Sequence, residues 1–160
     1  MLRDDRHGLR AMPTDSTPGL ANMVPHEHAV LIVEDHDVTR TTLAKLLKLH
    51  LDEGWQVLTA ATIAEGLALV ESEPDCLILD LMLPDGDGET VLRRVREAKL
   101  RTRVAVTTGT GDEARLESVR RLGPEVLLRK PVDPRQICQV CTAAAADTAR
   151  VGETERSYRH

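Results

Sequence analysis

Asp80 combines a reactive side chain with a position at which parallel sheets place their ligands. It closes an apolar run over residues 76–80, and runs of this length are typical of strands that are buried on both faces. Open α/β sheets bind their ligands outside the carboxyl ends of the strands. A carboxylate at such a strand end could attack phosphorus as a nucleophile and form an aspartyl phosphate.

Three further runs also end in polar residues that could assist this chemistry. Residues 29–33 precede Glu34 and Asp35, residues 104–106 precede Thr107 and Thr108, and residues 126–129 precede Lys130. Attack of one anion on another requires positive charge nearby. Mg²⁺ held by one or two carboxylates would supply it, and an ammonium group could pair with a phosphoryl oxygen as a point charge. The four strand ends together therefore indicate phosphoryl chemistry.

The segments between these runs carry helix signals that would place all four strand ends at one edge of a sheet. Asp37 is a good N-cap, residues 62–65 form a capping box, and Asp133 precedes a proline in the first turn of a helix. Helices are expected from about residues 37, 62, 89, 113 and 133, and a fifth strand over residues 55–59. Strands that alternate with helices imply right-handed crossovers. The sequence thus predicts an α/β fold with a doubly wound, five-stranded parallel sheet.

Composition narrows the class of protein. The chain has 160 residues and a formal charge of -5, which suits one domain and argues against binding driven by nucleic-acid phosphates. The three cysteines are spaced too irregularly for a disulfide framework, and no apolar stretch could span a bilayer. A cytoplasmic location is expected. We divide the chain into an irregular N-terminal extension (residues 1–27), a folded domain (28–149) and a polar C-terminal tail (150–160).

Four segments, in this order, resemble the receiver domain of two-component response regulators. The resemblance covers about residues 28–146 and rests on residues 30–35, 77–88, 106–109 and 127–131. It implies the flavodoxin-like (βα)5 fold with strand order 2-1-3-4-5. It also implies a phosphoprotein that is not an enzyme, apart from assisting its own phosphorylation and dephosphorylation.

The resemblance implies a role for each polar strand end. Asp80 would be the phosphoacceptor, and Lys130 would contact the phosphoryl group. Glu34, Asp35 and Asp80 would hold Mg²⁺, and the backbone carbonyl of Met82 would complete the protein ligands.

The resemblance also implies a switch. Thr108 would supply the switch hydroxyl, because it precedes Gly109 in the matching segment, and Thr107 is the less favoured choice. Many receivers carry an aromatic residue three positions before the lysine, where this chain has Leu127. Leucine lacks a polar tip, so we expect Leu127 to prefer the apolar interior in both states of the switch.

Partners follow from the same resemblance. The phosphoryl donor would be a histidine kinase or a histidine phosphotransfer protein. Only about 30 residues follow Lys130, too few for a DNA-binding domain of on the order of 50 residues. We therefore expect a stand-alone receiver without direct DNA binding, which signals to a downstream protein through the face formed by the fourth helix, fifth strand and fifth helix. A homodimer is compatible with this view.

Two other functions remain open on the sequence alone. A phosphohydrolase of the haloacid dehalogenase type shares the nucleophile, the magnesium and the lysine, but places a second Asp two residues after the nucleophile, where this chain has Met82. A receiver-like module that binds partners without phosphorylation would be expected to lack part of the acidic site, and every part is present. Asp35 also has a structural interpretation as a helix N-cap.

Two further patterns do not predict sites. Residues 85–89 start like a calcium loop, but Thr90 and Arg96 stand where that loop needs Gly and Glu. Cys138 and Cys141 form a C-x-x-C pattern inside a predicted helix without a second pair of ligands. Core packing is expected of Cys141.

Overall fold

The predicted five-stranded parallel sheet is present in the computed structural model, which describes residues 26–157. Its strands are β1 (His28–Val33), β2 (Trp55–Ala60), β3 (Cys76–Asp80), β6 (Arg103–Thr108) and β7 (Val126–Arg129). They lie side by side in the order β2-β1-β3-β6-β7, and each neighbouring pair is parallel. Counted along the chain within this sheet, the order is 2-1-3-4-5, as predicted.

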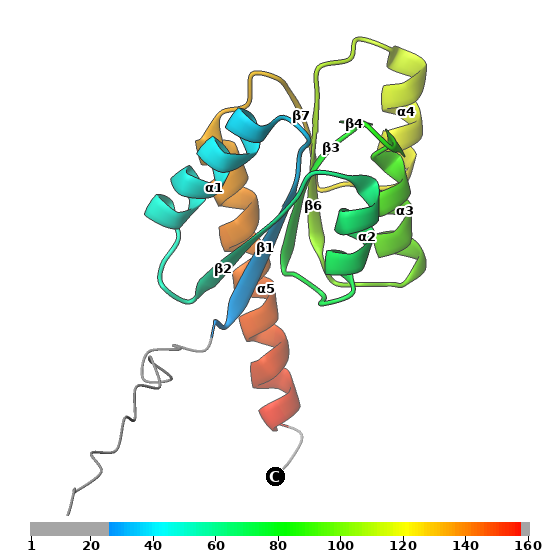
Figure 1. Cartoon of the computed structure of the whole chain (residues 1–160). Coiled ribbons are helices and arrows are strands. Elements are labelled where there is room, and N and C mark those ends of the chain that lie inside the picture. The colour runs from blue at the N-terminus through cyan, green and yellow to red at the C-terminus, as the bar shows by residue number, and fades with distance from the viewer. Residues whose placement is uncertain (1–25, 158–160) are drawn as a thin grey trace, which may run out of the picture.

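Within residues 26–157, five helices cover the two faces of the sheet (Figure 1). They are α1 (Asp37–His50), α2 (Ile63–Val70), α3 (Glu89–Glu97), α4 (Glu113–Arg121) and α5 (Pro134–Ser157). Helices α1 and α5 pack on one face, and α2, α3 and α4 pack on the other. This doubly wound arrangement leaves β2 as an edge strand. No helix in the range that the structure describes combines the length and the apolar character needed to cross a bilayer.

The core forms two aliphatic layers, one on each face of the sheet. Alternate residues of β1 point to opposite faces: Val30 and Ile32 pack towards α1 and α5, while Leu31 and Val33 pack towards α2, α3 and α4. Strands that are covered on both faces need apolar side chains at every position, and all five residues of β3 are buried. This burial explains why the runs that precede the polar strand ends are continuously apolar.

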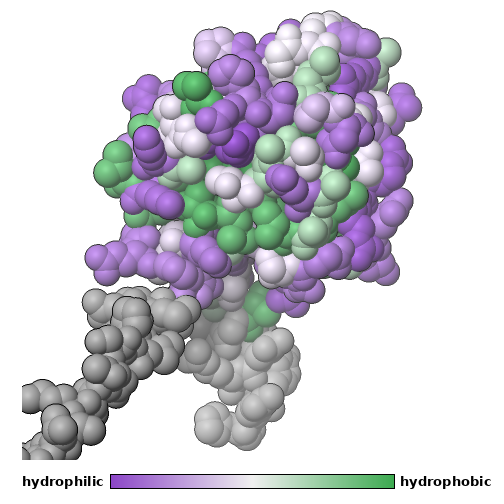
Figure 2. Space-filling view, in the orientation of Figure 1, coloured by the Kyte–Doolittle hydropathy of each residue, from purple (hydrophilic) through white to green (hydrophobic). Residues whose placement is uncertain are grey.

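The surface is largely polar. Figure 2 shows hydrophilic residues over most of the face seen in Figure 1, with a hydrophobic area near its centre. The large hydrophobic side chains that are most exposed among the described residues are Val38, Leu49 and Met82.

Two helix ends differ from the sequence-based expectation. The N-cap of α1 is His36 instead of Asp37, because the imidazole Nδ1 of His36 accepts the Thr39 N–H at 3.3 Å. Asp37 becomes the first helical residue, and its carboxylate pairs with Arg40 at 2.6 Å. A carboxylate in the first turn is still favourable, since it lies near the positive end of the helix dipole.

Helix α5 extends past the expected end of the folded domain, while the domain boundary itself stays a prediction. We expected the folded domain to end at residue 149, but α5 continues to Ser157. Polar residues do not prevent this, because a helix satisfies its backbone hydrogen bonds within itself. The predicted extension over residues 1–27 lies outside the described residues except for positions 26 and 27, and it stays a prediction.

A short antiparallel hairpin follows the central strand. It consists of β4 (Met82–Leu83) and β5 (Gly86–Asp87). The chain then folds back so closely that a Cβ atom on Gly88 would lie 2.1 Å from the backbone oxygen of Asp80. The Gly88 N–H also donates to the Leu81 carbonyl at 2.9 Å. Glycine at position 88 therefore lets this loop pass in close contact with the backbone of Asp80.

We predict that Gly88→Ala lowers the free energy of unfolding by about 3 kcal/mol, because the added methyl group meets backbone that cannot move aside cheaply. Gly111→Ala is the matched control: a Cβ there meets nothing within 4 Å, and its effect should stay within about 0.5 kcal/mol. Urea denaturation of both variants measures the difference. Equal stabilities would show that the loop relaxes around the methyl group.

Candidate functional site

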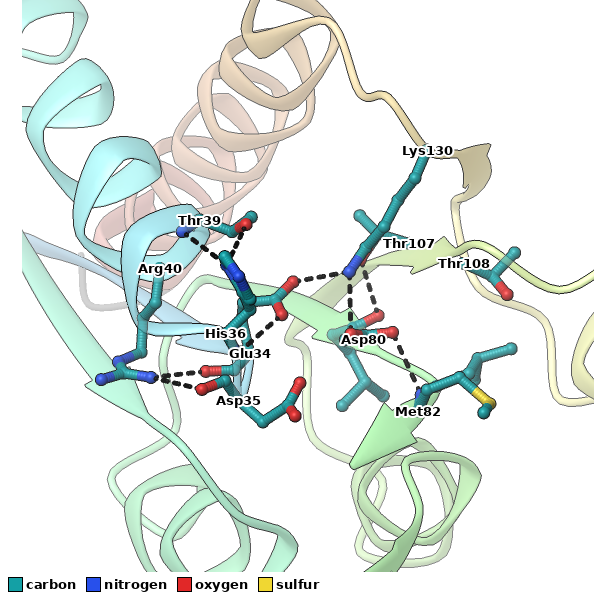
Figure 3. A network of polar contacts seen from close by, with 12 residues as sticks. Glu34, Asp35, His36, Thr39, Arg40, Asp80, Met82, Thr107, Thr108 and Lys130 are labelled. Carbon is teal, nitrogen blue, oxygen red and sulfur yellow. Dashed lines mark hydrogen bonds and ion pairs between the residues drawn. The ribbon is translucent and has the colours of Figure 1, made fainter. Parts of the chain in front are cut away.

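Lys130 brings the carboxyl ends of three strands together (Figure 3). Its ammonium Nζ lies 2.8 Å from Glu34 Oε2, at the end of β1, and 2.8 Å from Asp80 Oδ2, at the end of β3. Both carboxylates are buried, with relative exposures of 4% for Glu34 and 3% for Asp80. Charged hydrogen bonds of this kind are stronger than neutral ones, and each buried carboxylate needs such a partner.

The site holds more negative than positive charge. One carboxylate oxygen from each of Glu34, Asp35 and Asp80 lies within 4.8 Å of the other two. Glu34 and Asp80 are buried, whereas Asp35 is exposed. Three carboxylates around one ammonium leave an excess negative charge that a hard divalent cation could neutralise. Because Mg²⁺ prefers oxygen ligands and keeps several waters, this acidic cluster fits a magnesium ion.

Backbone contacts hold the buried acids in place. Asp80 Oδ1 accepts the Met82 N–H at 3.0 Å, and Glu34 Oε1 accepts the His36 N–H at 3.1 Å. Each carboxylate thus uses one oxygen for a backbone N–H and the other for Lys130. The N–H group of Met82 is accounted for by this bond, and the proposed use of its carbonyl as a metal ligand stays a prediction.

The environment of Lys130 changes its acid–base behaviour. Burial alone would lower the pKa of the ammonium group, but the hydrogen bonds and charges of Asp80 and Glu34 outweigh burial and raise the pKa above its ordinary value. The side chain therefore stays charged throughout the physiological range. A fixed positive charge at this point suits contact with an anionic group.

The two threonines at the end of β6 differ in their surroundings. Thr107 lies opposite Asp80 in the sheet register, and Figure 3 shows it beside the Lys130 ammonium group. Thr108 is fully buried, and its hydroxyl oxygen accepts the Thr110 N–H at 3.0 Å. Figure 3 shows the Thr108 side chain directed away from Asp80. A role for Thr108 at a phosphorylated Asp80 would therefore require movement.

Sequence reasoning missed one residue that holds the β1 end of the site and one that connects the neighbouring hairpin to α2. Arg40, in the first turn of α1, donates to the carbonyls of Glu34 at 2.9 Å and Asp35 at 3.2 Å. Asp85, in the turn of the β4–β5 hairpin, accepts the N–H groups of Ile63 at 2.8 Å and Ala64 at 3.1 Å. Its only sequence signal was its place in a Gly- and Asp-rich turn, which does not reveal that it caps a helix 22 residues earlier.

The cysteines behave as expected for core residues. Cys141 on α5 is fully buried, as is Cys76 on β3. A hydrogen bond with Cys141 and burial both raise the pKa of the Cys76 thiol, which makes it unreactive. Cys138 is only partly buried. Among the described residues, the only cluster with metal-ligand geometry is the acidic one.

Comparison with known proteins identifies this arrangement. Residues 30–142, more than half of the chain, match the family model described as the response regulator receiver domain. The chain belongs to the response regulator receiver domain family. The resemblance inferred from the four sequence segments is thereby confirmed, together with its flavodoxin-like fold.

Individual relatives agree with this membership. The chain is 30% identical over 118 residues to the photosynthetic apparatus regulatory protein RegA of Rhodobacter capsulatus. The aligned segment covers 73% of this chain and 62% of RegA. It is 31% identical over 130 residues to the acid tolerance regulatory protein ActR of Rhizobium meliloti. That alignment covers 80% of this chain and 66% of ActR. The chain thus spans less than two thirds of the length of these relatives.

A solved structure is similar over most of the chain. The signal receiver domain of a LuxO repressor protein from Vibrio parahaemolyticus has a TM-score of 0.66 and 27% identity. The alignment covers 83% of this chain and 98% of that domain.

We predict that removal of the central cation destabilises the receiver domain. Lys130→Met should lower the free energy of unfolding by on the order of 2 kcal/mol without metal, because two buried carboxylates lose their shared partner. The loss should be smaller than for a fully buried pair, since the Lys130 side chain is 32% exposed. Lys45→Met, at an exposed lysine of α1, is the control.

The same stability measurement with added magnesium tests whether the acidic cluster binds the metal. If the acidic cluster binds Mg²⁺, millimolar MgCl₂ should restore part of the stability of Lys130→Met and leave the Lys45→Met variant in line with the unmodified protein. Denaturant curves with and without the salt measure both effects. A variant that is as stable as the unmodified protein in the absence of metal would contradict the role of Lys130 as the central cation.

Proposed function

We propose that this receiver domain accepts a phosphoryl group on Asp80 from a histidine kinase or a histidine phosphotransfer protein. The observation that supports the proposal is the joint contact of Lys130 Nζ with Asp80 and Glu34 at 2.8 Å, beside a third carboxylate. A buried carboxylate that contacts a cation, within an acidic cluster that fits Mg²⁺, would be suited to receive an anionic group once the metal ion has neutralised the excess negative charge.

The transfer would proceed by substitution at phosphorus. The P–N bond of a phosphohistidine breaks, a P–O bond forms to an Asp80 carboxylate oxygen, and the donor imidazole leaves with the bonding electron pair. Mg²⁺, held by Glu34, Asp35 and Asp80, would neutralise charge on the phosphoryl oxygens. Lys130, whose pKa is raised by its carboxylate neighbours, would pair with a phosphoryl oxygen without first needing a proton.

The side-chain chemistry of Met82 argues against the phosphohydrolase alternative. Enzymes of that type need a proton-donating acid two residues after the nucleophile, and a thioether cannot donate a proton. The Met82 side chain is also largely exposed. We infer that the domain assists only its own phosphorylation and dephosphorylation. The intact acidic cluster equally favours phosphorylation over a purely passive binding module.

The donor must contact the surface around Asp80, because its phosphohistidine has to reach the carboxylate. A groove of about 660 Å³ borders Lys130 between α1 and the start of α5. Its apolar lining consists of Val38, Leu43, Leu46, Pro131, Val132, Pro134 and Ile137. Val38 is 66% exposed, and a partner that packs into this groove would remove its side chain from water together with the rest of the apolar lining. We infer that the donor protein docks along this groove.

Signal output is proposed to pass through protein contacts at the face formed by α4, β7 and α5. The net charge of -5 disfavours binding to nucleic-acid phosphates, so direct DNA binding is not expected. Thr108 is proposed as the switch hydroxyl. Leu127 already packs against the core layer beneath α2, α3 and α4, which agrees with its expected preference for the interior.

The central prediction is a single, metal-dependent phosphorylation. Incubation with acetyl phosphate and Mg²⁺ should add one phosphoryl group, visible by intact-mass spectrometry. Asp80→Asn and chelation of the metal should each abolish the addition. Asp85→Asn serves as the control, because this exposed carboxylate contacts only backbone N–H groups among the described residues. Labelling of Asp80→Asn at the unmodified level would rule out Asp80 as the acceptor.

A second prediction concerns the switch. Beryllofluoride, a phosphoryl mimic, should strongly change amide hydrogen exchange over residues 107–113 and only weakly around Leu127. The reason is that Thr108 must leave its bond with Thr110, whereas Leu127 needs no inward movement. Mass spectrometry of peptides from both segments measures the ranking, and the reverse ranking would assign the switch to Leu127.

A further inference from the structure

Arg115, in the first turn of α4, reaches across to the loop that follows Asp80. Its Nη2 donates to the Leu81 carbonyl at 2.8 Å and lies 2.9 Å from Asp87 Oδ1. Its Nη1 lies 2.9 Å from Met82 Sδ. Since Met82 and Asp87 are paired across the β4–β5 hairpin, one guanidinium group contacts both strands of that hairpin.

A single peptide unit connects this guanidinium group to Asp80. The carbonyl of Leu81 and the N–H of Met82 belong to the same planar peptide bond. Its N–H donates to Asp80 Oδ1 at 3.0 Å, and its carbonyl accepts from Arg115. The carboxylate and the guanidinium group therefore lie at opposite ends of one rigid unit, and rotation at one end must move the other.

Arg115 differs from the other arginines of α4. Arg120 and Arg121 pair at 3.6–3.8 Å with glutamates of their own helix and have side chains 48% and 77% exposed. Arg115 is 22% exposed, and its Nε is buried without a hydrogen-bond partner in the part of the chain that the structure describes. A surface ion pair would not require this burial.

The far end of α4 is held separately. Arg96 of α3 donates to the carbonyls of Leu122 at 3.2 Å and Gly123 at 2.7 Å, just after the helix ends. Ser118 donates to the Glu89 carboxylate of α3 at 3.2 Å. These contacts anchor the C-terminal half of α4 to α3, so a displacement of the Leu81–Met82 peptide would act mainly on its first turn.

We propose that Arg115 is a positioning residue that couples Asp80 to α4 through the Leu81–Met82 peptide. The inference rests on the proposed phosphorylation of Asp80. Conversion of the carboxylate into an acyl phosphate removes negative charge from the acceptor of the Met82 N–H and weakens that charge-assisted bond. The peptide then reorients, the Leu81 carbonyl shifts against Arg115, and the first turn of α4 moves with the guanidinium group.

The test compares Arg115→Gln with Arg120→Gln. Hydrogen exchange over residues 113–118 is measured with and without beryllofluoride and Mg²⁺, and phosphorylation by acetyl phosphate is measured in parallel. Arg115→Gln should still accept one phosphoryl group, but its exchange response in α4 should fall to less than about half of that of the unmodified protein, as expected when a coupling contact is lost. Arg120→Gln should respond like the unmodified protein. An undiminished response of Arg115→Gln would overturn the proposal.

A second variant covers the case in which Arg115→Gln does not fold. Asp87→Asn removes the charge opposite Arg115 but keeps the Oδ1 acceptor that bonds the Glu89 N–H at 2.9 Å, so the start of α3 is preserved. It should reduce the α4 response in the same direction, and an unchanged response would count against the coupling. Failure of the proposed function looks different, because the unmodified protein would then accept no phosphoryl group and show no response to beryllofluoride.

Discussion

The contact of one ammonium group with two buried carboxylates is the interaction around which this domain is organised. Lys130 meets Glu34 and Asp80 at 2.8 Å each, although the three residues are up to 96 positions apart in the chain. Burying either carboxylate alone would cost several kcal/mol. The shared cation makes the burial tolerable, and the parallel order of β1, β3, β6 and β7 brings the three side chains to one edge of the sheet.

The charges at this site do not balance, because three carboxylates surround a single ammonium group. The three carboxylates repel one another, and a bound divalent metal ion would relieve that repulsion. The same excess of negative charge makes Lys130 hold its proton.

The loop after Asp80 connects the acidic cluster to α4. Gly88 allows the chain to fold back onto the Asp80 backbone, and the β4–β5 hairpin that results presents its surface to α4. A packed loop with few degrees of freedom transmits small displacements better than a flexible one. Arg115 lies where that loop and α4 meet, so one peptide unit connects the Asp80 carboxylate to the guanidinium group of α4.

Local sequence was sufficient for the sheet and for the acidic cluster, because continuous apolar runs predict buried parallel strands and the carboxyl ends of such strands must share an edge. That rule placed Glu34, Asp35, Asp80 and Lys130 at one edge, whereas their individual roles were taken from the resemblance to receiver domains. Tertiary structure decided what depends on segments distant in the sequence: Asp85 caps α2, and Arg115 reaches the Leu81 carbonyl 34 positions away. These side chains are ordinary polar residues in the sequence, since hydrogen bonds between separate segments leave no periodic pattern. Their roles exist only once the sheet has brought those segments together.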